Sequence, residues 1–257
     1  MALVTVSGWR PFIFSAVAII PIASILLPVS SADSSWPCSR PKAEAVRAFR
    51  AKVLTNTWPA FQQNPYKNQT AHSSAVIRRT LRNKSQVCAI QYTDAERRRY
   101  NMRQFHSLAD AVYNGYIVSH QGKCGACSTL QDLAVYLEKP DLMKPVRACA
   151  LRGLVWNKWA ERCLATIGFS SSCASIWYYN TWNTRRQCFW PCIRAWATNQ
   201  PNNLPPDGRL NPCLQCDEDK SGPVFKYFAG RTRRDSGITS AIKRPNSQVY
   251  HMSHCYF

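Results

Sequence analysis

Acidic residues are scarce in this sequence, with 14 Asp+Glu against 33 Lys+Arg in 257 residues. A balance this basic favours anionic partners such as acidic polysaccharide, anionic lipid headgroups or a negatively charged substrate. Three acids stand together at 217–219, but they lack the spacing of a calcium loop, and we expect a solvated turn. The chain also lacks internal repeats and low-complexity tracts, which excludes a repeat architecture.

Long apolar runs are equally scarce. The only one extends from Phe12 to Leu27, follows the lone charge of Arg10 and precedes Ser30-Ser31-Ala32. It is shorter than the roughly 20 residues that cross a bilayer comfortably, so residues 1–32 are predicted to be a cleaved signal peptide, with an uncleaved anchor as the alternative. After cleavage we expect no integral membrane segment, and a protein that is secreted or held in the secretory lumen.

Cysteine is abundant. An even number in an oxidising compartment predicts up to six disulfides, each adding about 2–4 kcal/mol of stability, although spacing does not decide their pairing. Two glycosylation acceptors, Asn68 and Asn83, fit the same route. All 12 cysteines follow the predicted cleavage site: Cys38, Cys88, Cys124, Cys127, Cys149, Cys163, Cys173, Cys188, Cys192, Cys213, Cys216 and Cys255.

Apolar spacing and capping signals outline the secondary structure. Thr93 and Glu96 form a capping box that predicts a helix rich in arginine. The predicted fold class is α+β, predominantly α-helical, in one disulfide-stabilised domain over residues 33–257 whose C-terminal third, from about residue 199, is rich in loops. We expect strands at 87–92 and 116–119, and helices at 41–54, 93–103, 108–114, 130–137, 146–167 and 172–187.

Aromatic residues concentrate in one stretch. We expect them to pack in the core beside disulfides; an exposed sugar-binding platform is the alternative, because aromatic rings offer wide apolar faces. The residues are Trp177, Tyr178, Tyr179, Trp182, Phe189, Trp190 and Trp196.

Residues 119–133 carry the clearest chemical signal. Cys124 and Cys127 flank a Gly-Ala pair, and Cys127 is expected to open a helix. A thiol at a helix N-terminus lies near unpaired N–H groups and the positive end of the dipole, which favour the thiolate that a nucleophile requires.

The run Gln121-Gly122-Lys123-Cys124-Gly125-Ala126-Cys127 resembles the active-site stretch of papain-type cysteine peptidases. The resemblance implies that Cys127 is the nucleophile, Cys124 a structural half-cystine and Gln121 an oxyanion-hole donor. It places the family's histidine near His251 and His254, which follow Cys127 by 124 and 127 residues. Ser128 stands where the family usually has tryptophan, and no Asn-Ser-Trp segment follows the histidines.

Other interpretations of this segment stay open. Two structural half-cystines is the favoured interpretation of Cys124 and Cys127, because an oxidising route promotes disulfides. A redox-active pair is another alternative, and so is a zinc site completed by Cys213 and Cys216, although the separation is long. His120, next to the segment, is a second candidate base. No metal or cofactor is predicted.

Two functions follow. The first is a non-catalytic binding protein whose basic surface meets acidic glycan or lipid headgroups; Arg231, Arg233 and Arg234 are the candidate anion ligands. The second is a secreted thiol enzyme that uses Cys127 for acyl transfer or hydrolysis. Nucleic acid is an unlikely partner for a secreted protein, and the sequence does not predict the oligomeric state.

Overall fold

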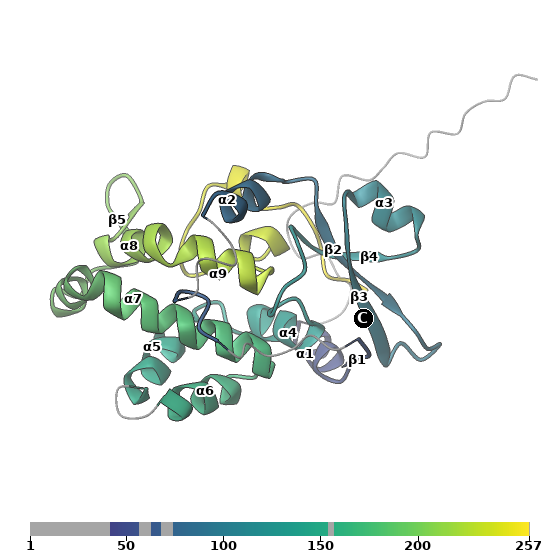
Figure 1. The fold of residues 1–257 in the computed structure, drawn as a ribbon, viewed down its shortest axis with the longest axis horizontal. Coiled ribbons are helices and arrows are strands. Elements are labelled where there is room, and N and C mark those ends of the chain that lie inside the picture. Colours follow the sequence, from purple (N-terminus) through teal and green to yellow (C-terminus); the bar gives the residue numbers. More distant parts are fainter. Residues whose placement is uncertain (1–41, 57–62, 68–73, 154–156, 257) are drawn as a thin grey trace, which may run out of the picture. The chain divides into compact units, whose positions relative to one another are not determined.

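The computed structural model describes residues 42–56, 63–67, 74–153 and 157–256 (Figure 1). The predicted signal peptide, Cys38 and the glycosylation acceptor Asn68 lie outside these residues. All described residues fall within one compact unit, residues 32–257.

A small sheet has the strand order β1-β3-β2-β4. Strand β2 (Val87–Tyr92) lies at its centre and pairs antiparallel with β3 (Arg99–Phe105) and β4 (Ile117–Gln121), while β1 (Val53–Leu54) pairs parallel with β3. The strands predicted at 87–92 and 116–119 are therefore confirmed, and the helix predicted at 41–54 ends earlier, at Arg50, before β1.

The arginine-rich helix predicted from Thr93 is wrong. Residues 93–98 turn, and the Asp94 carboxylate accepts hydrogen bonds from the backbone N–H groups of Arg98 and Arg99 at 2.9 and 2.7 Å. The chain then continues as β3, where Tyr100 and Met102 are buried and Arg99 and Arg103 are exposed. The alternation of buried and exposed residues in β3 outweighed the local capping signal, because it buries one face of the strand while its backbone pairs with β1 and β2.

Helices α1 (Lys42–Arg50) and α4 (Leu130–Glu138) share a hydrophobic core with the sheet, in which Phe49, Ile90 and Leu133 are buried. Helix α3 (Leu108–Tyr113) begins at the predicted cap, where Ser107 accepts a hydrogen bond from the Asp110 N–H, and Ala111 packs with β2 and β3. Seven of the nine residues of α4 are buried, and the helix contributes to both large cores of the unit.

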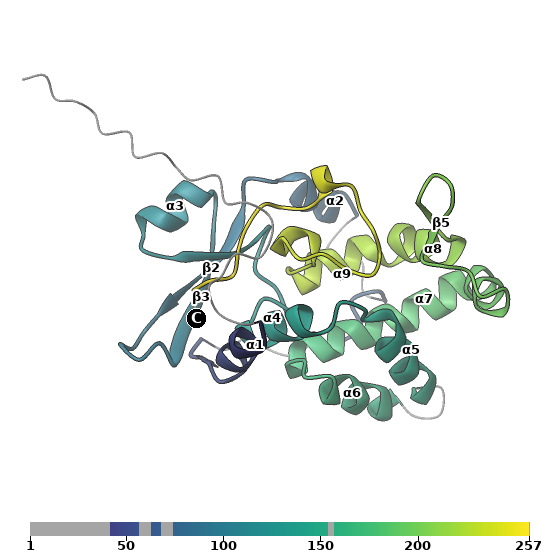
Figure 2. The same cartoon turned by 180° about the vertical axis from the view of Figure 1, so that it is seen from behind.

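The second core contains no residue of the sheet and lies mainly among helices (Figures 1 and 2). The helix predicted at 146–167 is two helices, because Gly153 ends the first where Ala160 of the second approaches it closely. The elements of this part are α2 (Ser74–Arg82), α5 (Met143–Arg152), α6 (Asn157–Thr166), α7 (Ser171–Ala197), α8 (Pro212–Lys220) and α9 (Gly222–Ala229).

The acidic residues 217–219 are not a solvated turn. They lie in α8, where the side chains of Asp217 and Glu218 are drawn inward to hydrogen-bonding partners. The hairpin of β5 (Asn203–Leu204) and β6 (Arg209–Leu210) precedes α8. Beyond Gly230 the chain is mainly loop, with the short 3-10 helices η1 (Arg234–Ser236) and η2 (Asn246–Gln248).

Five disulfides join these elements. Cys88–Cys124 and Cys127–Cys173 connect the segment before α4 to β2 and to α7, and Cys149–Cys163 joins α5 to α6. Cys188–Cys216 and Cys192–Cys213 hold the second half of α7 against α8. Cys255 is also disulfide-bonded, and no described cysteine is free. The predicted class, a disulfide-stabilised α+β fold that is mostly helical, is confirmed.

Among the described residues, no helix combines the length and apolarity needed to span a bilayer.

The bridges differ in the length of chain that they close, and their removal should differ in cost. Replacing Cys127 and Cys173 by Ala opens a separation of 46 residues, whereas replacing Cys149 and Cys163 opens one of 14. By loop-closure entropy the first pair should lower the free energy of unfolding by about 1 kcal/mol more than the second, within an overall cost of about 2–5 kcal/mol each. Urea unfolding of the two double variants measures this, and equal losses would contradict it.

Candidate functional site

The structure corrects the proposed nucleophile. Cys127 is fully buried and bonded to Cys173, and Cys124 is bonded to Cys88, so neither sulfur is a thiol. Helix α4 begins only at Leu130, with Thr129 as its N-cap, and Cys127 therefore lies outside the first turn. Of the interpretations of this pair, two structural half-cystines is the one that the structure contains.

The backbone of the Cys-Gly-Ala-Cys run packs directly against the backbone of residues 228–230. The N–H groups of Ala126 and Cys127 donate to the carbonyls of Phe228 and Ala229 at 2.9 and 2.8 Å. A Cβ on Gly125 would lie 2.5 Å from the Phe228 carbonyl oxygen, and a Cβ on Gly230, whose φ is +73°, would lie 2.5 Å from the Gly125 nitrogen. Glycine is required at both positions because only a bare backbone fits there.

Both ring nitrogens of His120, the second candidate base, form hydrogen bonds within the protein. Its Nε2 lies 2.7 Å from the Ser128 hydroxyl and its Nδ1 lies 2.9 Å from the Gln121 carbonyl oxygen. The Nδ1–H donates to that carbonyl, so Nε2 accepts from Ser128, whose oxygen accepts in turn from the Gly125 N–H. Burial, and then the nearby Arg231, lower the pKa of His120 well below its usual value. His120 and Ser128 are both fully buried, and the pair locks the turn before α4.

Arg231 is the centre of this region. It is fully buried, and its five N–H donors meet five oxygens. Nε donates to the Cys127 carbonyl at 3.1 Å, Nη1 to the Ser119 carbonyl and the Ser236 hydroxyl at 3.0 Å each, and Nη2 to the Ser128 carbonyl at 3.1 Å and to the Ser119 hydroxyl. A guanidinium enclosed in this way has no donor left for a ligand, which corrects its assignment as an anion ligand.

His254 completes the buried polar network around Arg231. Its Nε2 lies 2.7 Å from the Ser236 carbonyl oxygen and its Nδ1 lies 3.0 Å from the Tyr256 hydroxyl. Tyr256 in turn accepts from Ser119, which also holds Arg231. Burial, with Arg231 nearby, lowers the pKa of His254 to about 3, so the ring is neutral. His254 is therefore a structural residue and not the base of Cys127.

The arginine cluster is divided by the fold. The Arg233 guanidinium donates to the carbonyl oxygens of Tyr136, at 2.6 Å, and Lys139, and so caps the C-terminal end of α4. Arg234 instead reaches a pocket of about 620 Å³. We call this the basic pocket; its lining is Leu81, Lys84, Gln121, Lys226, Arg234, Asp235, Ser247, Gln248, Val249, Tyr250 and His251.

The basic pocket unites three of the residues selected from the sequence, Gln121, Arg234 and His251. Gln121 is held at the end of β4 by donating from Nε2 to the Lys84 carbonyl at 2.8 Å, and His251 is exposed on the C-terminal segment. Sequence reasoning missed Lys84 and Lys226, because isolated lysines on a basic chain carry no local signal.

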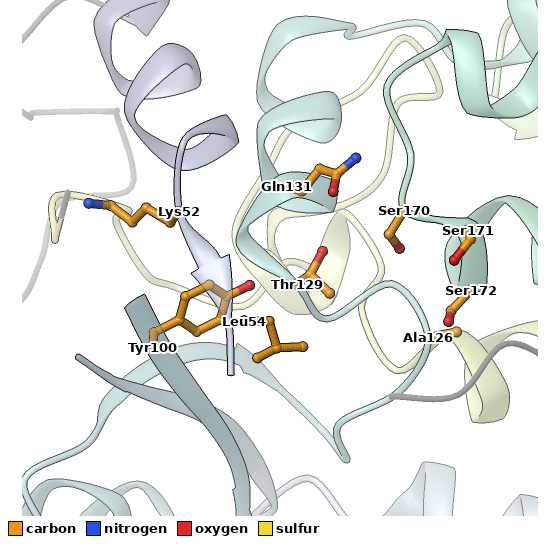
Figure 3. Close-up of a pocket in the computed structure, with 9 residues that line it drawn as sticks. All are labelled: Lys52, Leu54, Tyr100, Ala126, Thr129, Gln131, Ser170, Ser171 and Ser172. Carbon is orange, nitrogen blue, oxygen red and sulfur yellow. The ribbon is translucent and has the colours of Figure 1, made fainter. Parts of the chain in front are cut away.

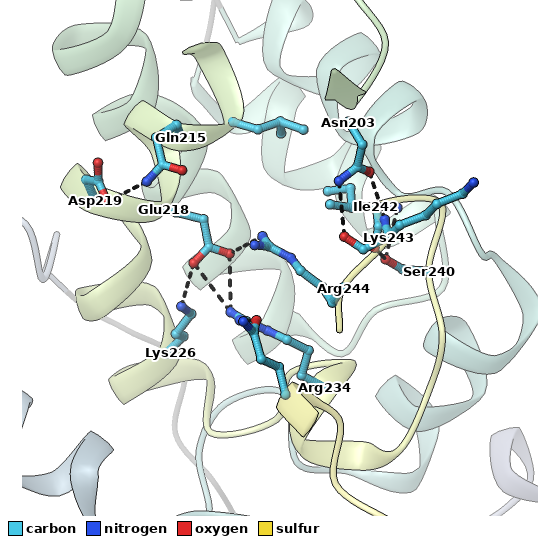
Figure 4. Close-up of polar contacts among 12 residues, drawn as sticks. Asn203, Gln215, Glu218, Asp219, Lys226, Arg234, Ser240, Ile242, Lys243 and Arg244 are labelled. Atoms are coloured by element: carbon cyan, nitrogen blue, oxygen red, sulfur yellow. Dashed lines mark hydrogen bonds and ion pairs between the residues drawn. The ribbon is translucent and has the colours of Figure 1, made fainter. Parts of the chain in front are cut away.

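Charge in the wall of the basic pocket is organised by Glu218 (Figure 4). Its carboxylate forms ion pairs with Lys226 at 2.7 Å, Arg244 at 2.7 Å and Arg234 at 3.3 Å. Burial acts to raise the pKa of Glu218, but these three cations together lower it below its usual value, so the group stays ionised. Lys84 lies 3.9 Å from Asp235. Glu218 and Arg244 are not part of the lining, in which Lys84, Lys226 and Arg234 exceed the carboxylate of Asp235 by two positive charges.

A smaller pocket, of about 180 Å³, lies where α4 and α7 begin (Figure 3). Thr129 and Ser170, the caps of these helices, both donate to the Asp132 carboxylate, at 2.5 and 2.9 Å, and the Ser170 N–H donates to it at 2.8 Å. Burial raises the pKa of Asp132 to about 6. The carboxylate thus joins two helix N-termini to each other, and we assign the pocket a structural origin.

Within the part of the chain that the structure describes, no cluster of three or more His, Cys, Asp or Glu side chains is placed to hold a metal ion. The pairs Cys124/Cys127 and Cys213/Cys216, considered above for zinc, are all in disulfides.

Residues 157–252 match a family of unknown function (DUF8771). The match spans α6 to η2 and includes the part of the basic pocket from Lys226 to His251, but not Lys84 or Gln121. No curated protein and no solved structure matches the chain.

Replacing Arg231 by Met should lower the free energy of unfolding by more than about 3 kcal/mol, because three buried carbonyls lose a donor at roughly 1–3 kcal/mol each. The matched control is Arg98→Met, since Arg98 is exposed and should tolerate the change within about 0.5 kcal/mol. Urea unfolding decides the matter, and a similar small loss in both variants would refute the central role of Arg231.

The buried imidazoles should make the fold sensitive to acid. Unfolded histidine has a pKa of about 6.5, so below that pH the unfolded chain binds protons that His120 and His254 cannot, and stability falls by up to about 1.4 kcal/mol per pH unit for each ring. Asp132 acts oppositely, since its pKa is raised to about 6 and its protonation favours the folded state.

These three groups together should therefore contribute a loss of about 1.4 kcal/mol per pH unit between about pH 6 and 4, and Asp132→Asn should steepen the measured slope. Urea unfolding across this range measures the slope. A slope that Asp132→Asn leaves unchanged would contradict this assignment of charges.

Proposed function

We propose that this is a secreted binding protein that holds an acidic glycan, a sugar carrying sulfate or carboxylate groups, in the basic pocket. The observation that carries the proposal is the excess of two positive charges that Lys84, Lys226 and Arg234 leave over Asp235 in the lining of the pocket. A ligand with one or two negative charges would balance this excess.

The geometry of the cations supports an anionic ligand. Lys226 and Arg234 line the pocket, and both are held by Glu218, so little side-chain entropy remains to be lost when an anion binds. Arg234 also donates to Gln248 at 3.3 Å, which directs its guanidinium along the pocket wall. A planar guanidinium presents paired donors that suit sulfate and carboxylate oxygens.

The remaining lining supports a sugar. A volume of about 620 Å³ lies within the usual range of roughly 300–1,000 Å³ for ligand sites. Tyr250 offers a ring face for the apolar side of a sugar, while Ser247, Gln248 and His251 offer hydrogen-bonding groups for its hydroxyls. A bare phosphate or sulfate would use only the cations and leave this wall without a function.

Secretion is part of the proposal. Disulfides persist in oxidising compartments, and the described residues hold five. Asn83, at the end of α2, is exposed, and its side-chain oxygen accepts from the N–H and hydroxyl of Ser85 at 3.2 and 2.7 Å. An exposed acceptor asparagine of this kind is accessible for glycosylation in the secretory route. Asn68 is proposed as a second acceptor on its sequence alone.

Binding of a heparin-derived oligosaccharide, measured by calorimetry, tests the pocket. The double variant Lys84→Ala, Arg234→Ala should bind at least about tenfold more weakly, since each charged hydrogen bond contributes roughly 1.5–3 kcal/mol. Binding should weaken with added salt, because exposed charges are screened within about 8 Å at physiological ionic strength.

Two controls separate the pocket from general basicity. Arg98→Ala, Arg103→Ala removes two exposed charges, one from β3 and one from the turn before it, and should change the affinity less than twofold. An uncharged oligosaccharide of equal length should not bind. Equal weakening by both double variants would show that overall charge, and not the basic pocket, holds the glycan.

A further inference from the structure

The second half of α7 presents an aromatic face to solvent. Trp190 and Trp196 are 76 and 67% exposed, and Phe189 and Ile193 are 47 and 42% exposed. These four residues follow the spacing of a single helix face, whereas Cys188 and Ala195 on the opposite face are buried. The expectation that Phe189, Trp190 and Trp196 pack in the core is therefore wrong, and the apolar surface that they leave exposed requires an explanation.

This aromatic face is held rigidly. Pro191 lacks the N–H that would bond to the Gln187 carbonyl, and α7 departs from helical geometry at Cys188, with φ −123° and ψ 22°. Beyond the kink, Cys188–Cys216 and Cys192–Cys213 fasten the buried side of the helix to α8. Figures 1 and 2 show this end of α7 at the end of the helical part that lies away from strands β2 to β4.

Arginines accompany the aromatic face on its own helix. No acidic residue occurs between Glu161 and Asp207, a stretch that contains all of α7. Arg185, Arg186 and Arg194 are exposed on the same helix. A helix segment with bulky apolar residues, tryptophan and arginine is the pattern of elements that lie in the interface of a bilayer with anionic lipids.

We propose that the aromatic face of α7 docks the protein on the surface of an anionic lipid bilayer, with Phe189, Trp190, Ile193 and Trp196 in the headgroup region and the arginines on lipid phosphates. Tryptophan suits this depth because its ring is largely apolar but carries a polar N–H. This site is separate from the basic pocket and uses none of its residues.

Two other occupants fit the face less well. A sugar platform needs ring faces that lie flat together, but the rings of Phe189 and Trp190 are 5.2 Å apart and inclined at 78°, and Ile193 offers no ring. A second copy of this chain, joined symmetrically, would bring the arginines of one helix against those of the other, which like-charge repulsion opposes.

Flotation with lipid vesicles tests the proposal. Vesicles of phosphatidylcholine containing phosphatidylserine should carry the protein upward, and vesicles of phosphatidylcholine alone should carry much less. Trp190→Ala, Trp196→Ala should lower the partition coefficient at least about tenfold, because the two largest apolar side chains of the face would no longer be buried among the headgroups. Brominated lipids should quench the tryptophan emission of the wild-type protein and quench that of the double variant less.

Matched variants make the result specific. Trp159→Ala, which removes a tryptophan 45% exposed on α6, should leave partitioning unchanged. Lys84→Ala, Arg234→Ala in the basic pocket should also leave it unchanged, which separates this site from the glycan site. Ile193→Glu, a surface change that places a carboxylate in the face, should abolish binding to the anionic vesicles.

Three results would overturn the proposal: unaltered flotation of the Trp190→Ala, Trp196→Ala variant, dimerisation of the wild-type protein that this variant loses, or binding of an uncharged glycan that the variant loses. The last two would assign the face to a second copy or to a sugar.

Discussion

The enclosure of Arg231 is the interaction on which the rest of the structure depends. Its five donors reach the last strand of the sheet through Ser119, the segment before α4 through Cys127 and Ser128, and the 3-10 helix η1 through Ser236. Burying a guanidinium is costly unless every donor is satisfied. All five oxygens must therefore lie within hydrogen-bonding distance of Arg231 at the same time. The sheet, the central helix α4 and the C-terminal segment are thereby fixed to one another.

Disulfides and glycines bring these oxygens to the guanidinium. Cys88–Cys124 and Cys127–Cys173 anchor both sides of the segment that supplies the carbonyls, and Gly125 and Gly230 allow the segment that bears Arg231 to approach it. The residues that resemble a peptidase active site are thus needed for packing. The surface chemistry lies elsewhere, in the basic pocket and on the aromatic face of α7, where charge and apolar area remain accessible.

Local patterns predicted part of this structure correctly. The cap at Ser107, the strand β2 and the helix α4 were predictable because a few neighbouring residues decide them. The strand β3 was not predictable in this way, since the alternation of buried and exposed side chains stabilises it only when β1 and β2 pair with it in the sheet. In the candidate site, Gln121, Arg234 and His251 were selected from the sequence, but for different roles, and Lys84 and Lys226 were missed because their proximity arises from contacts between distant segments.

The sequence by itself determined the strong positive charge, the abundance of disulfides and the mostly helical class, because composition and short-range periodicity decide these properties. Only the tertiary structure decided which cysteines pair, which arginine is enclosed and which reaches solvent. Arg231 and Arg234 are three residues apart and chemically identical, yet one is surrounded by five oxygens and the other lines a pocket. The difference arises from segments more than 80 residues away in the chain, whose positions no local pattern specifies.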